Sequence, residues 1–275
     1  MTNRLIKAAH EIASIEKACN LGDRTFDYIL TKIKEGVSEK ELALEIKHFI
    51  KKHKAKTSFP PIVAFSKNSA FPHHKPTNQK LVKNQQIKID LGVKLNNYCS
   101  DMTRTVFFGS ASAEYKKMYQ TVLDAQKNAL EVLGSKESPS RRRLLAKNVV
   151  YHLGDGSVDH LEGGSPKRSE GHDSFEVDSR GIKASSVDKV ARDHIASKGY
   201  PTIPHSLGHG IGLEVHEAPI ISPKSKDTLN IGMVFTIEPG IYLPGFGGIR
   251  IEDVVVLEKS GLRLLTHAPK NLIEL

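Results

Sequence analysis

The sequence predicts a single α+β domain built from two similar halves. Amphipathic helical segments alternate with strand-like runs, and the same order of elements occurs twice along the chain. The 275 residues include 39% hydrophobic and 26% charged residues, which is typical of a globular protein. We therefore expect residues 1–275 to form one domain.

The first half is expected to begin with helices. Apolar residues recur at helical intervals over the first 18 residues, and Asp23 is a candidate cap for a second helix over 24–34. Ser38 followed by Glu41 is typical of a capping box and predicts a third helix. Strand-like runs follow at 61–65, 86–92 and 98–108, and a long helix at 113–133.

The same order returns after residue 180. A helical pattern at 185–198 precedes strand-like runs at 234–238 and 249–257. The polar residues repeat as well, as a histidine followed by two acids: His73, Asp90 and Asp101, then His216, Glu238 and Glu252. We interpret this order as an internal duplication. The alternative is that any α+β protein offers such coincidences.

Residues 135–180 have no counterpart in the first half. They are rich in Gly, Ser, Asp, His and Arg and show little sustained periodicity. A segment of this length without regular structure is usually functional or disordered, and we interpret it as a surface insertion. Its histidines lack the tight spacing of metal ligands, which favours solvated loop residues: His152, His160 and His172.

Asp90 and Asp101 are predicted to face each other across a hairpin. They lie symmetrically about the Leu95–Asn96 bond, within two strand-like runs. Directly opposed residues have Cβ atoms about 4.5–5.5 Å apart, and like charges there are destabilising. Because the neighbours are apolar, either one acid is protonated or a cation lies between the two.

Glu238 and Glu252 form a second pair, symmetric about Gly245. Arg250 shares the face of Glu252 and is placed to steady that carboxylate or a bound substrate. Four carboxylates from two hairpins require positive charge. Two divalent ions would supply it, because carboxylates shared between two metals are how dinuclear hydrolases activate water.

A glycine-rich segment adds histidines to these acids. His205, His209 and His216 lie among glycines, which allow the main chain to approach a ligand closely. Beside two acid pairs, three histidines indicate at least one metal ligand. His209 and His216 are seven residues apart in the sequence, so a bulge or turn must separate them if both reach the site.

Together these motifs resemble the M24 metallopeptidases, which include methionine aminopeptidase, Xaa-Pro aminopeptidase and prolidase. The resemblance covers nearly the whole chain except 135–180. It implies the pita-bread fold, with two pseudo-symmetric α+β halves around a curved antiparallel sheet. The motifs that carry it are Asp90-x-Gly92, Ser100-Asp101-x-Thr103-Arg104, Gly208-His209-Gly210-Ile211-Gly212, His216-Glu217, Glu238-Pro239-Gly240 and Arg250-Ile251-Glu252-Asp253.

The resemblance also implies a set of metal ligands. Asp101 and Glu252 would bridge two metal ions, Asp90 would hold one of them, and His209 and Glu238 would hold the other. Four hard carboxylates and one imidazole suit Mn²⁺, Co²⁺, Zn²⁺ or Fe²⁺, and the family habit favours Mn²⁺ or Co²⁺.

Catalytic and substrate-side residues follow from the same resemblance. Glu238 would carry a proton, and His216 would contact the scissile peptide. His73 would lie on the substrate side. His205 and Arg250 match residues that separate the proline-directed branch from methionine aminopeptidases.

The subfamily prediction rests on few residues. Methionine aminopeptidases usually carry an aromatic residue before the last glutamate ligand and a histidine after it, where this chain has Ile251 and Asp253. We therefore expect cleavage of Xaa-Pro bonds at the N-termini of short peptides or proteins. The alternatives are a methionine or broad-specificity aminopeptidase and a non-catalytic peptide- or nucleic-acid-binding module. His74 is interpreted as an exposed loop histidine.

Charge and composition bear on partners and location. The formal charge is +9, but the lysines are scattered and not grouped with aromatics, which disfavours nucleic-acid binding. No apolar run approaches the ~20 residues that span a bilayer, the N-terminus lacks a signal-peptide pattern, and two cysteines predict no disulfide framework. We expect a cytoplasmic protein without membrane contact.

The expected start of the chain differs from that of the resembled enzymes. Xaa-Pro aminopeptidases and prolidases commonly carry an N-terminal domain that limits substrate length and helps form a dimer. This chain is expected to start directly at the catalytic helices. The sequence therefore leaves open whether the protein is a monomer or a dimer, and how long its peptide substrates are.

Overall fold

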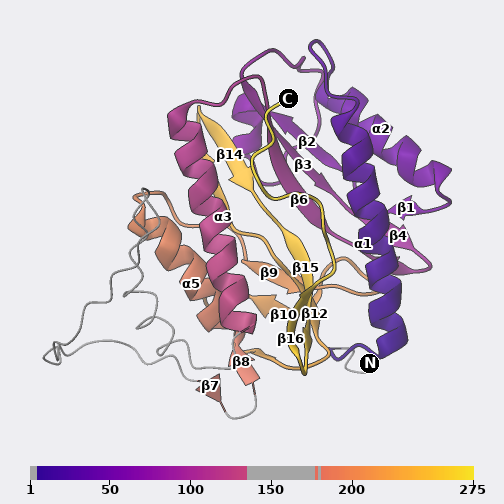
Figure 1. Ribbon diagram of the computed structural model, residues 1–275, viewed down its shortest axis with the longest axis vertical. Helices are drawn as coiled ribbons and strands as arrows, with labels where there is room; N and C mark the ends of the chain where they lie inside the picture. Colours follow the sequence, from indigo (N-terminus) through magenta and orange to yellow (C-terminus); the bar gives the residue numbers. More distant parts are fainter. Residues whose placement is uncertain (1–4, 135–176, 179–180) are drawn as a thin grey trace, which may run out of the picture.

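The computed structural model describes residues 5–134, 177–178 and 181–275, and the helices within them form two pairs. Helix α1 packs against α2, and α3 packs against α5. In Figure 1 the pairs lie on either side of a central band of strands. The helices are α1 (Ala9–Leu30), α2 (Glu39–Lys52), α3 (Ala113–Gly134) and α5 (Ala184–Ser197), with a short 3-10 helix, η1 (Ser66–Ala70).

The first half has two small antiparallel sheets, which the pair α1 and α2 covers. In one sheet the order is β2–β3–β6, and α2 packs against its strand β2. In the other the order is β1–β4–β5, and α1 contacts β4 and β5. The strands are β1 (Lys56–Thr57), β2 (Ile62–Phe65), β3 (Gln85–Leu91), β4 (Val93–Leu95), β5 (Tyr98–Cys99) and β6 (Met102–Phe108).

The second half repeats this plan with a larger sheet. Its order is β10–β9–β12–β15–β16, and a hairpin of β13 and β14 connects β12 to β15. Three short strands form a separate sheet in the order β11–β8–β7. The bounds are β7 (Val177–Asp178), β8 (Gly181–Lys183), β9 (Gly208–Gly210), β10 (Glu217–Ile221), β11 (Thr228–Leu229), β12 (Val234–Ile237), β13 (Gly240–Leu243), β14 (Gly247–Arg250), β15 (Asp253–Glu258) and β16 (Gly261–Leu264).

Each half thus combines one helix pair with antiparallel strands, which confirms the predicted α+β class. The predicted capping box also forms at the start of α2. Ser38 Oγ accepts from Glu41 N at 3.2 Å, while a carboxylate oxygen of Glu41 accepts from Ser38 N at 2.7 Å. The apolar face that follows the cap is fully buried, as expected for an amphipathic helix: Leu42, Ile46 and Ile50.

One predicted helix boundary is wrong. Asp23 was expected to start a second helix, but α1 continues through it from Ala9 to Leu30. The carboxylate of Asp23 accepts instead from the main-chain N–H groups of His267, at 2.9 and 3.0 Å, and Ala268, at 2.9 Å. A capping-type side chain in mid-helix therefore fastens the C-terminal segment to α1.

The predicted register of the first acidic hairpin is also wrong. The turn lies at Asn96 and Asn97, whose φ angles of 50° and 72° suit a two-residue type I′ turn. Asp90 consequently pairs with Thr103, and Asp101 lies two residues before Thr103. The two aspartates still share one face but are diagonal neighbours, because a shift of two residues preserves the alternation of a strand.

The register of the second acidic hairpin is as predicted. Gly240 pairs with Arg250 on one side of the acids, and Ile237 pairs with Asp253 on the other. Both pairings are symmetric about Gly245, which has a φ of 84°. Glu238 and Glu252 therefore lie opposite each other between two ladders of the same register.

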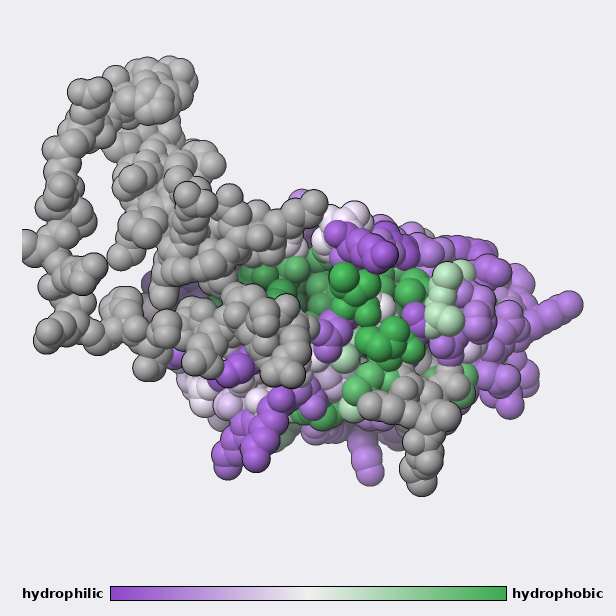
Figure 2. All heavy atoms as spheres, turned by 90° about the horizontal axis from the view of Figure 1, so that it is seen from below, coloured by the Kyte–Doolittle hydropathy of each residue, from purple (hydrophilic) through white to green (hydrophobic). Residues whose placement is uncertain are grey.

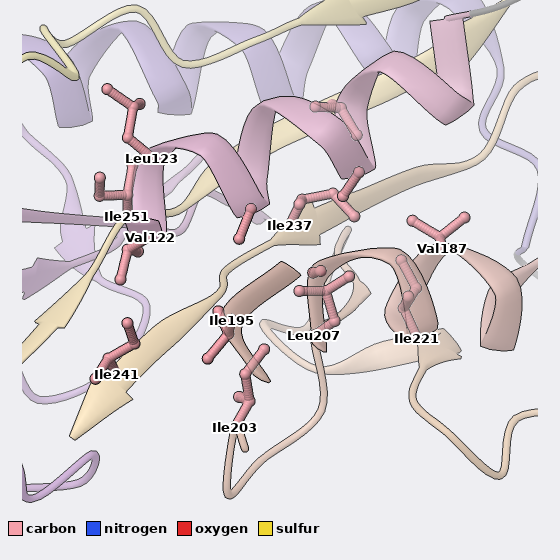
Figure 3. Packing of buried hydrophobic residues seen from close by; sticks show 14 of the residues in the cluster. Val122, Leu123, Val187, Ile195, Ile203, Leu207, Ile221, Ile237, Ile241 and Ile251 are labelled. Carbon is pink, nitrogen blue, oxygen red and sulfur yellow. The ribbon is translucent and has the colours of Figure 1, made fainter. Parts of the chain in front are cut away.

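The core of the second half packs α3 and α5 onto the sheet. Val122 and Leu123 of α3 and Val187 of α5 belong to one buried cluster with Ile237 at the end of β12 and Ile251 directly after β14 (Figure 3). All five side chains are buried, and burial of each contributes about 1.5–3 kcal/mol. This packing fixes the two strands that lead to Glu238 and Glu252.

The surface has one apolar region that is plain in Figure 2, on the face seen from below. Two strongly exposed hydrophobic residues, Ile6 (52%) and Ile231 (55%), come from segments that lie side by side, since Ile6 pairs with Met233.

Across the described ranges, every helix is too short or too polar to cross a membrane. Cys19 and Cys99 are free and buried, in α1 and β5.

Candidate metal centre and active site

All nine predicted site residues line a single cavity of about 510 Å³. The five predicted ligands come from both halves, and four further residues complete the wall on the predicted substrate side. An apolar stretch, Phe59 to Ile62, and Ile220 contribute the rest of one wall. The predicted site residues are Asp90, Asp101, His209, Glu238 and Glu252, with His73, His205, His216 and Arg250.

Four of the five predicted ligands lie near the end of a strand or in a break between strands. Asp90 is near the end of β3, and Asp101 occupies the break between β5 and β6. Glu238 follows β12, while Glu252 lies in the break between β14 and β15. His209 is the middle residue of the short strand β9. Such breaks interrupt main-chain pairing and so allow side chains of neighbouring strands to converge.

The side chains converge closely enough to share a cation. One ligand atom each from Asp101, His209 and Glu252 lies within 4.8 Å of the others. His209 Nε2 is 3.7 Å from a carboxylate oxygen of Asp101 and 3.4 Å from one of Glu238. Four of the predicted ligands are buried, with exposures of 7% for His209 and 2% for Glu252, whereas Glu238 is partly buried.

The crowding of these acids, together with their burial, raises their pKa values. Burial, together with the charges of Glu252, Asp90 and Glu238, raises the pKa of Asp101 well above its usual range. Burial and the charge of Asp90 raise the pKa of Glu252 to about 7. Burial and the charge of Glu252 also raise the pKa of Glu238. Without a cation, the acids are held close together at a cost in free energy.

Two features test whether divalent ions fit. Among the described residues, Asp90 Oδ1 is buried and has no hydrogen-bond partner, which leaves a carboxylate lone pair available to a cation. Burial lowers the pKa of His209 to about 4, so its imidazole is neutral, as a metal ligand must be. Oxygen donors with one imidazole are a suitable set for Mn²⁺, Co²⁺, Fe²⁺ or Zn²⁺.

Arg250 contacts a different acid from the one expected. Its guanidinium donates to Asp90 Oδ2 in a buried ion pair and to Thr103 Oγ1 at 2.9 Å. The Thr103 hydroxyl in turn donates to Glu252 Oε2 at 2.7 Å. Arg250 therefore reaches Glu252 through Thr103, which the sequence analysis named only as part of a motif and gave no role.

A turn brings His216 beside His209, as their spacing required. The chain leaves β9, turns, and returns antiparallel as β10, with a bulge between Glu217 and Ile220. The two imidazole rings are 4.4 Å apart between centroids and meet edge to face. His216 is exposed and lines the cavity.

His205 has a partner that the sequence analysis missed. Its Nε2 is 2.8 Å from the hydroxyl of Tyr242, which accepts from Arg250 Nη1 at 3.1 Å. Burial and the charge of Arg250 lower the pKa of His205 to about 3. His205 is therefore a neutral, oriented imidazole at neutral pH. Tyr242 lies eight residues before Arg250, on the strand β13 that pairs with β14, and an aromatic hydroxyl at that spacing is the sequence signal that could have found it.

The interpretation of His74 as an exposed loop residue is wrong. Its side chain is 11% exposed, and Nε2 is 2.9 Å from Glu39 Oε2, whereas its neighbour His73 is exposed at the cavity. Both histidines line the cavity, but the imidazole of His74 contacts Glu39 while His73 is exposed.

Glu39 is the anchor of the loop that contains both histidines. This buried carboxylate at the start of α2 accepts from Phe65 N at 2.8 Å and Asn68 Nδ2 at 2.9 Å. It also accepts from the N–H and hydroxyl of Thr77, at 2.8 and 2.7 Å. Burial alone would raise the pKa of Glu39, but these hydrogen bonds and the one with His74 lower it.

The second half anchors its histidine loop in a similar way. Asp188 of α5 is buried and forms a two-pronged ion pair with Arg192, at 2.6 and 3.1 Å. Arg192 donates to the carbonyls of Ile203 and His205, the latter at 2.6 Å. In both halves, a helical acid thus helps to position the loop that bears a cavity histidine.

Comparison with known proteins identifies the family. The sequence model of metallopeptidase family M24 matches residues 13–158 and 175–259. The chain belongs to this family. Its resemblance to M24 enzymes and its pita-bread fold are thereby confirmed.

Similar M24 proteins include peptidases acting on proline bonds. The chain is 36% identical to the Xaa-Pro dipeptidase of Pyrococcus horikoshii over 98% of its own length and 65% of that protein. It is 37% identical to an uncharacterised peptidase of Bacillus subtilis, covering 98% and 64%. The structure of an X-Pro aminopeptidase from Thermotoga maritima matches with a TM-score of 0.80, 34% identity and coverage of 99% and 65%.

The chain therefore spans just under two thirds of the length of these M24 relatives. The family match leaves residues 159–174 unmatched, inside the predicted insertion 135–180. Most of that segment, with His152, His160 and His172, lies outside the described residues. Its interpretation as a surface insertion stays a prediction.

Proposed function

We propose that this M24 chain is a two-metal peptidase that releases the N-terminal residue in front of a proline. The observation that carries the proposal is the convergence of Asp101, His209 and Glu252 in a cavity that His216 and Arg250 also line. The choice of Xaa-Pro bonds is supported by relatives whose names specify that activity.

Five side chains of this chain would hold two divalent ions in the proposal, with Mn²⁺ or Co²⁺ preferred to Zn²⁺ or Fe²⁺. When bound, the ions supply Lewis acidity and lower the pKa of the attacking water. They also supply the positive charge that the crowded carboxylates lack. The five residues are Asp90, Asp101, His209, Glu238 and Glu252.

Glu238 is the proton carrier in this mechanism. Its side chain is 14% exposed at the cavity, and burial with the neighbouring charge of Glu252 raises its pKa. A carboxylate with a raised pKa is a stronger base, so it can take a proton from water and deliver it to the leaving nitrogen.

The histidines would bind and orient the peptide. His216 is placed to donate to the oxygen that becomes negative when the carbonyl is attacked. His205 and Arg250, joined through Tyr242, form one wall of the cavity, and His73 approaches from the loop after η1. We infer that a peptide with a free N-terminus binds between these walls.

Two narrower questions belong to the same proposal. One relative is named a dipeptidase and another an aminopeptidase, so the substrate is either an Xaa-Pro dipeptide or a longer peptide beginning Xaa-Pro. A methionine or broad-specificity aminopeptidase is the alternative on the same site. A cytoplasmic location remains a prediction.

The test is peptide cleavage by metal-stripped protein reloaded with Mn²⁺. We expect release of alanine from Ala-Pro, from Ala-Pro-Ala or from both, and none from Met-Ala-Ala. Activity should vanish with chelator and return with Mn²⁺. Cleavage of Met-Ala-Ala alone would move the chain to the methionine branch, while bound metal without any cleavage would contradict the proposal.

A further inference from the structure

Lys88 is a buried side chain that the proposed mechanism does not use. It lies in β3, two residues before Asp90 and on the same face, and its exposure is 0%. An ammonium group has three N–H donors. Lys88 Nζ donates to three main-chain carbonyls, those of Ser69 at 3.1 Å, Phe71 at 2.7 Å and Pro72 at 3.3 Å.

These carbonyls belong to the chain that leads directly into His73. Because His73 is exposed, packing contributes little to its orientation. Its place at the cavity depends on the main chain on either side, which Glu39 holds after it through His74. The carbonyl of Pro72 also accepts from Arg250 Nη1 at 3.3 Å. The last peptide before His73 is therefore held by two buried side chains, those of Lys88 and Arg250.

Lys88 also contacts the opposite wall of the cavity. Its Nζ lies over the ring of Tyr242, 5.2 Å from the centroid, in a cation–π arrangement. The hydroxyl of the same tyrosine contacts His205 and Arg250. One ammonium group thus touches both the loop that carries His73 and the aromatic ring that orients His205.

We propose that Lys88 is a positioning residue, which sets the distance between His73 and the Tyr242–His205 wall by holding residues 69–72. The proposal rests on the proposed function, because it assigns Lys88 a part in presenting the peptide to that site. It needs no contact between Lys88 and the substrate.

The chemistry of the position supports a lysine in particular. A neutral side chain of the same length, such as methionine, would fill the space but leave buried carbonyls unpaired. The ends of the loop are held independently, since Glu39 binds Phe65, Asn68 and Thr77. Loss of Lys88 should therefore free residues 69–73 without detaching the whole loop.

The first arm of the test does not depend on activity. Hydrogen exchange of peptides covering 66–79 is compared in the Mn²⁺-loaded wild type, Lys88→Met and Lys83→Met. Lys83 is an exposed lysine just before the same strand, so its loss is a matched control. We expect faster exchange at 66–79 in Lys88→Met alone, and unchanged exchange there would overturn the proposal.

The second arm asks whether Lys88 acts through His73. With an Xaa-Pro peptide, kcat/KM should fall about 10–100-fold in Lys88→Met, as for a small misplacement of a binding group. In a His73→Ala background the same change should have little further effect, because coupled residues are not additive. Independent, multiplying losses would show that Lys88 acts by another route.

A conservative variant covers the case in which Lys88→Met does not fold. Lys88→Gln keeps an amide donor and should recover part of the protection at 66–79 and part of kcat/KM. If it recovered neither while binding Mn²⁺, the proposal would be overturned. A wild type that cleaves no peptide would refute the proposed function, but the exchange arm would still decide the role of Lys88.

Discussion

Among single residues, Arg250 illustrates how charge is distributed in the site. Its guanidinium pairs with Asp90 and reaches Glu252 only through the hydroxyl of Thr103. Removing one partner of a buried ion pair leaves an uncompensated charge. Arg250 therefore lines the cavity and is the counter-charge of Asp90, and its Nε lies 4.0 Å from a carboxylate oxygen of Glu238.

Replacement of Glu238 tests the proton carrier. In Glu238→Gln the side chain keeps its size but cannot take a proton, so we expect kcat to fall about 10²–10⁴-fold. The measurement is steady-state cleavage of an Xaa-Pro peptide, with bound Mn²⁺ determined on the same sample. Glu214→Gln makes the same change at an exposed glutamate and should be neutral. Near-normal turnover in Glu238→Gln would rule out this role.

At the level of elements, helices position the loops that bear histidines. The start of α2 holds the loop of His73 through Glu39, and α5 holds the loop of His205 through Asp188 and Arg192. Buried, charged hydrogen bonds fix a loop more firmly than packing of its mostly polar side chains could. These helices therefore contribute to the site although they lie outside it.

The variant Glu39→Gln tests this anchoring. An amide cannot accept at both of its ends, so at least one donor among Phe65 N, Asn68 and Thr77 loses its acceptor. We expect unfolding free energy to fall by about 2–3 kcal/mol and KM for peptides to rise. Chemical denaturation measures the first and kinetics the second. Glu35→Gln, at an exposed acid in the turn before α2, is the control, and equal stability of the two variants would contradict the anchoring role.

Across the whole molecule, the site lies where the two halves meet. Asp90 and Asp101 come from the first half, whereas His209, Glu238 and Glu252 come from the second. Direct contacts already join the halves there, as in the main-chain bond from Glu252 N to Thr103 O at 3.1 Å. Metal bound by both sets of ligands should stabilise the entire domain, because it binds the folded state alone.

The pKa shifts predict how stability of the metal-free protein depends on pH. Burial and Asp90 raise the pKa of Glu252 to about 7, against ~4.3 in an unfolded chain, so the folded state keeps its proton longer. The raised pKa of Glu252 therefore contributes to the free energy of unfolding. This contribution is complete below the pKa of the unfolded chain and is lost as pH rises through 7. Burial instead lowers the pKa of His209 to about 4 and of His205 to about 3, so their contribution grows with pH and is complete above ~6.5.

Between about pH 6.5 and 8 the contribution of the histidines to stability is already complete, so a change in stability there reports the raised pKa of Glu252. In this pH range Tm of the metal-free protein should fall by several degrees as pH rises. The variant Glu252→Gln should show a smaller fall of Tm over the same range. Added Mn²⁺ should raise Tm more at pH 8 than at 6.5, because the ligands bind metal when deprotonated. Thermal scans with chelator and with Mn²⁺ measure both. A Tm that rises with pH in the metal-free protein would contradict the raised pKa values.

Much of the fold could be predicted because its signals are local. The capping box of Ser38 and Glu41 and the symmetry of Glu238 and Glu252 about Gly245 depend on residues close in sequence. The register of the hairpin that turns at Asn96 and Asn97 could not be predicted in this way, because turns at two different positions both satisfied the hydrophobic alternation of its strands. The continuity of α1 through Asp23 depended on a partner more than 240 residues away.

The order of residues along the chain was enough to predict four carboxylates and a histidine in family order, and the two-half α+β plan that carries them. Which partner each charge has depends on the folded structure. It paired Arg250 with Asp90, turned His74 toward Glu39, and placed the ammonium of Lys88 among three carbonyls. The reason is physical, since the energy of a buried charge depends on groups brought near it by folding and not on its neighbours along the chain.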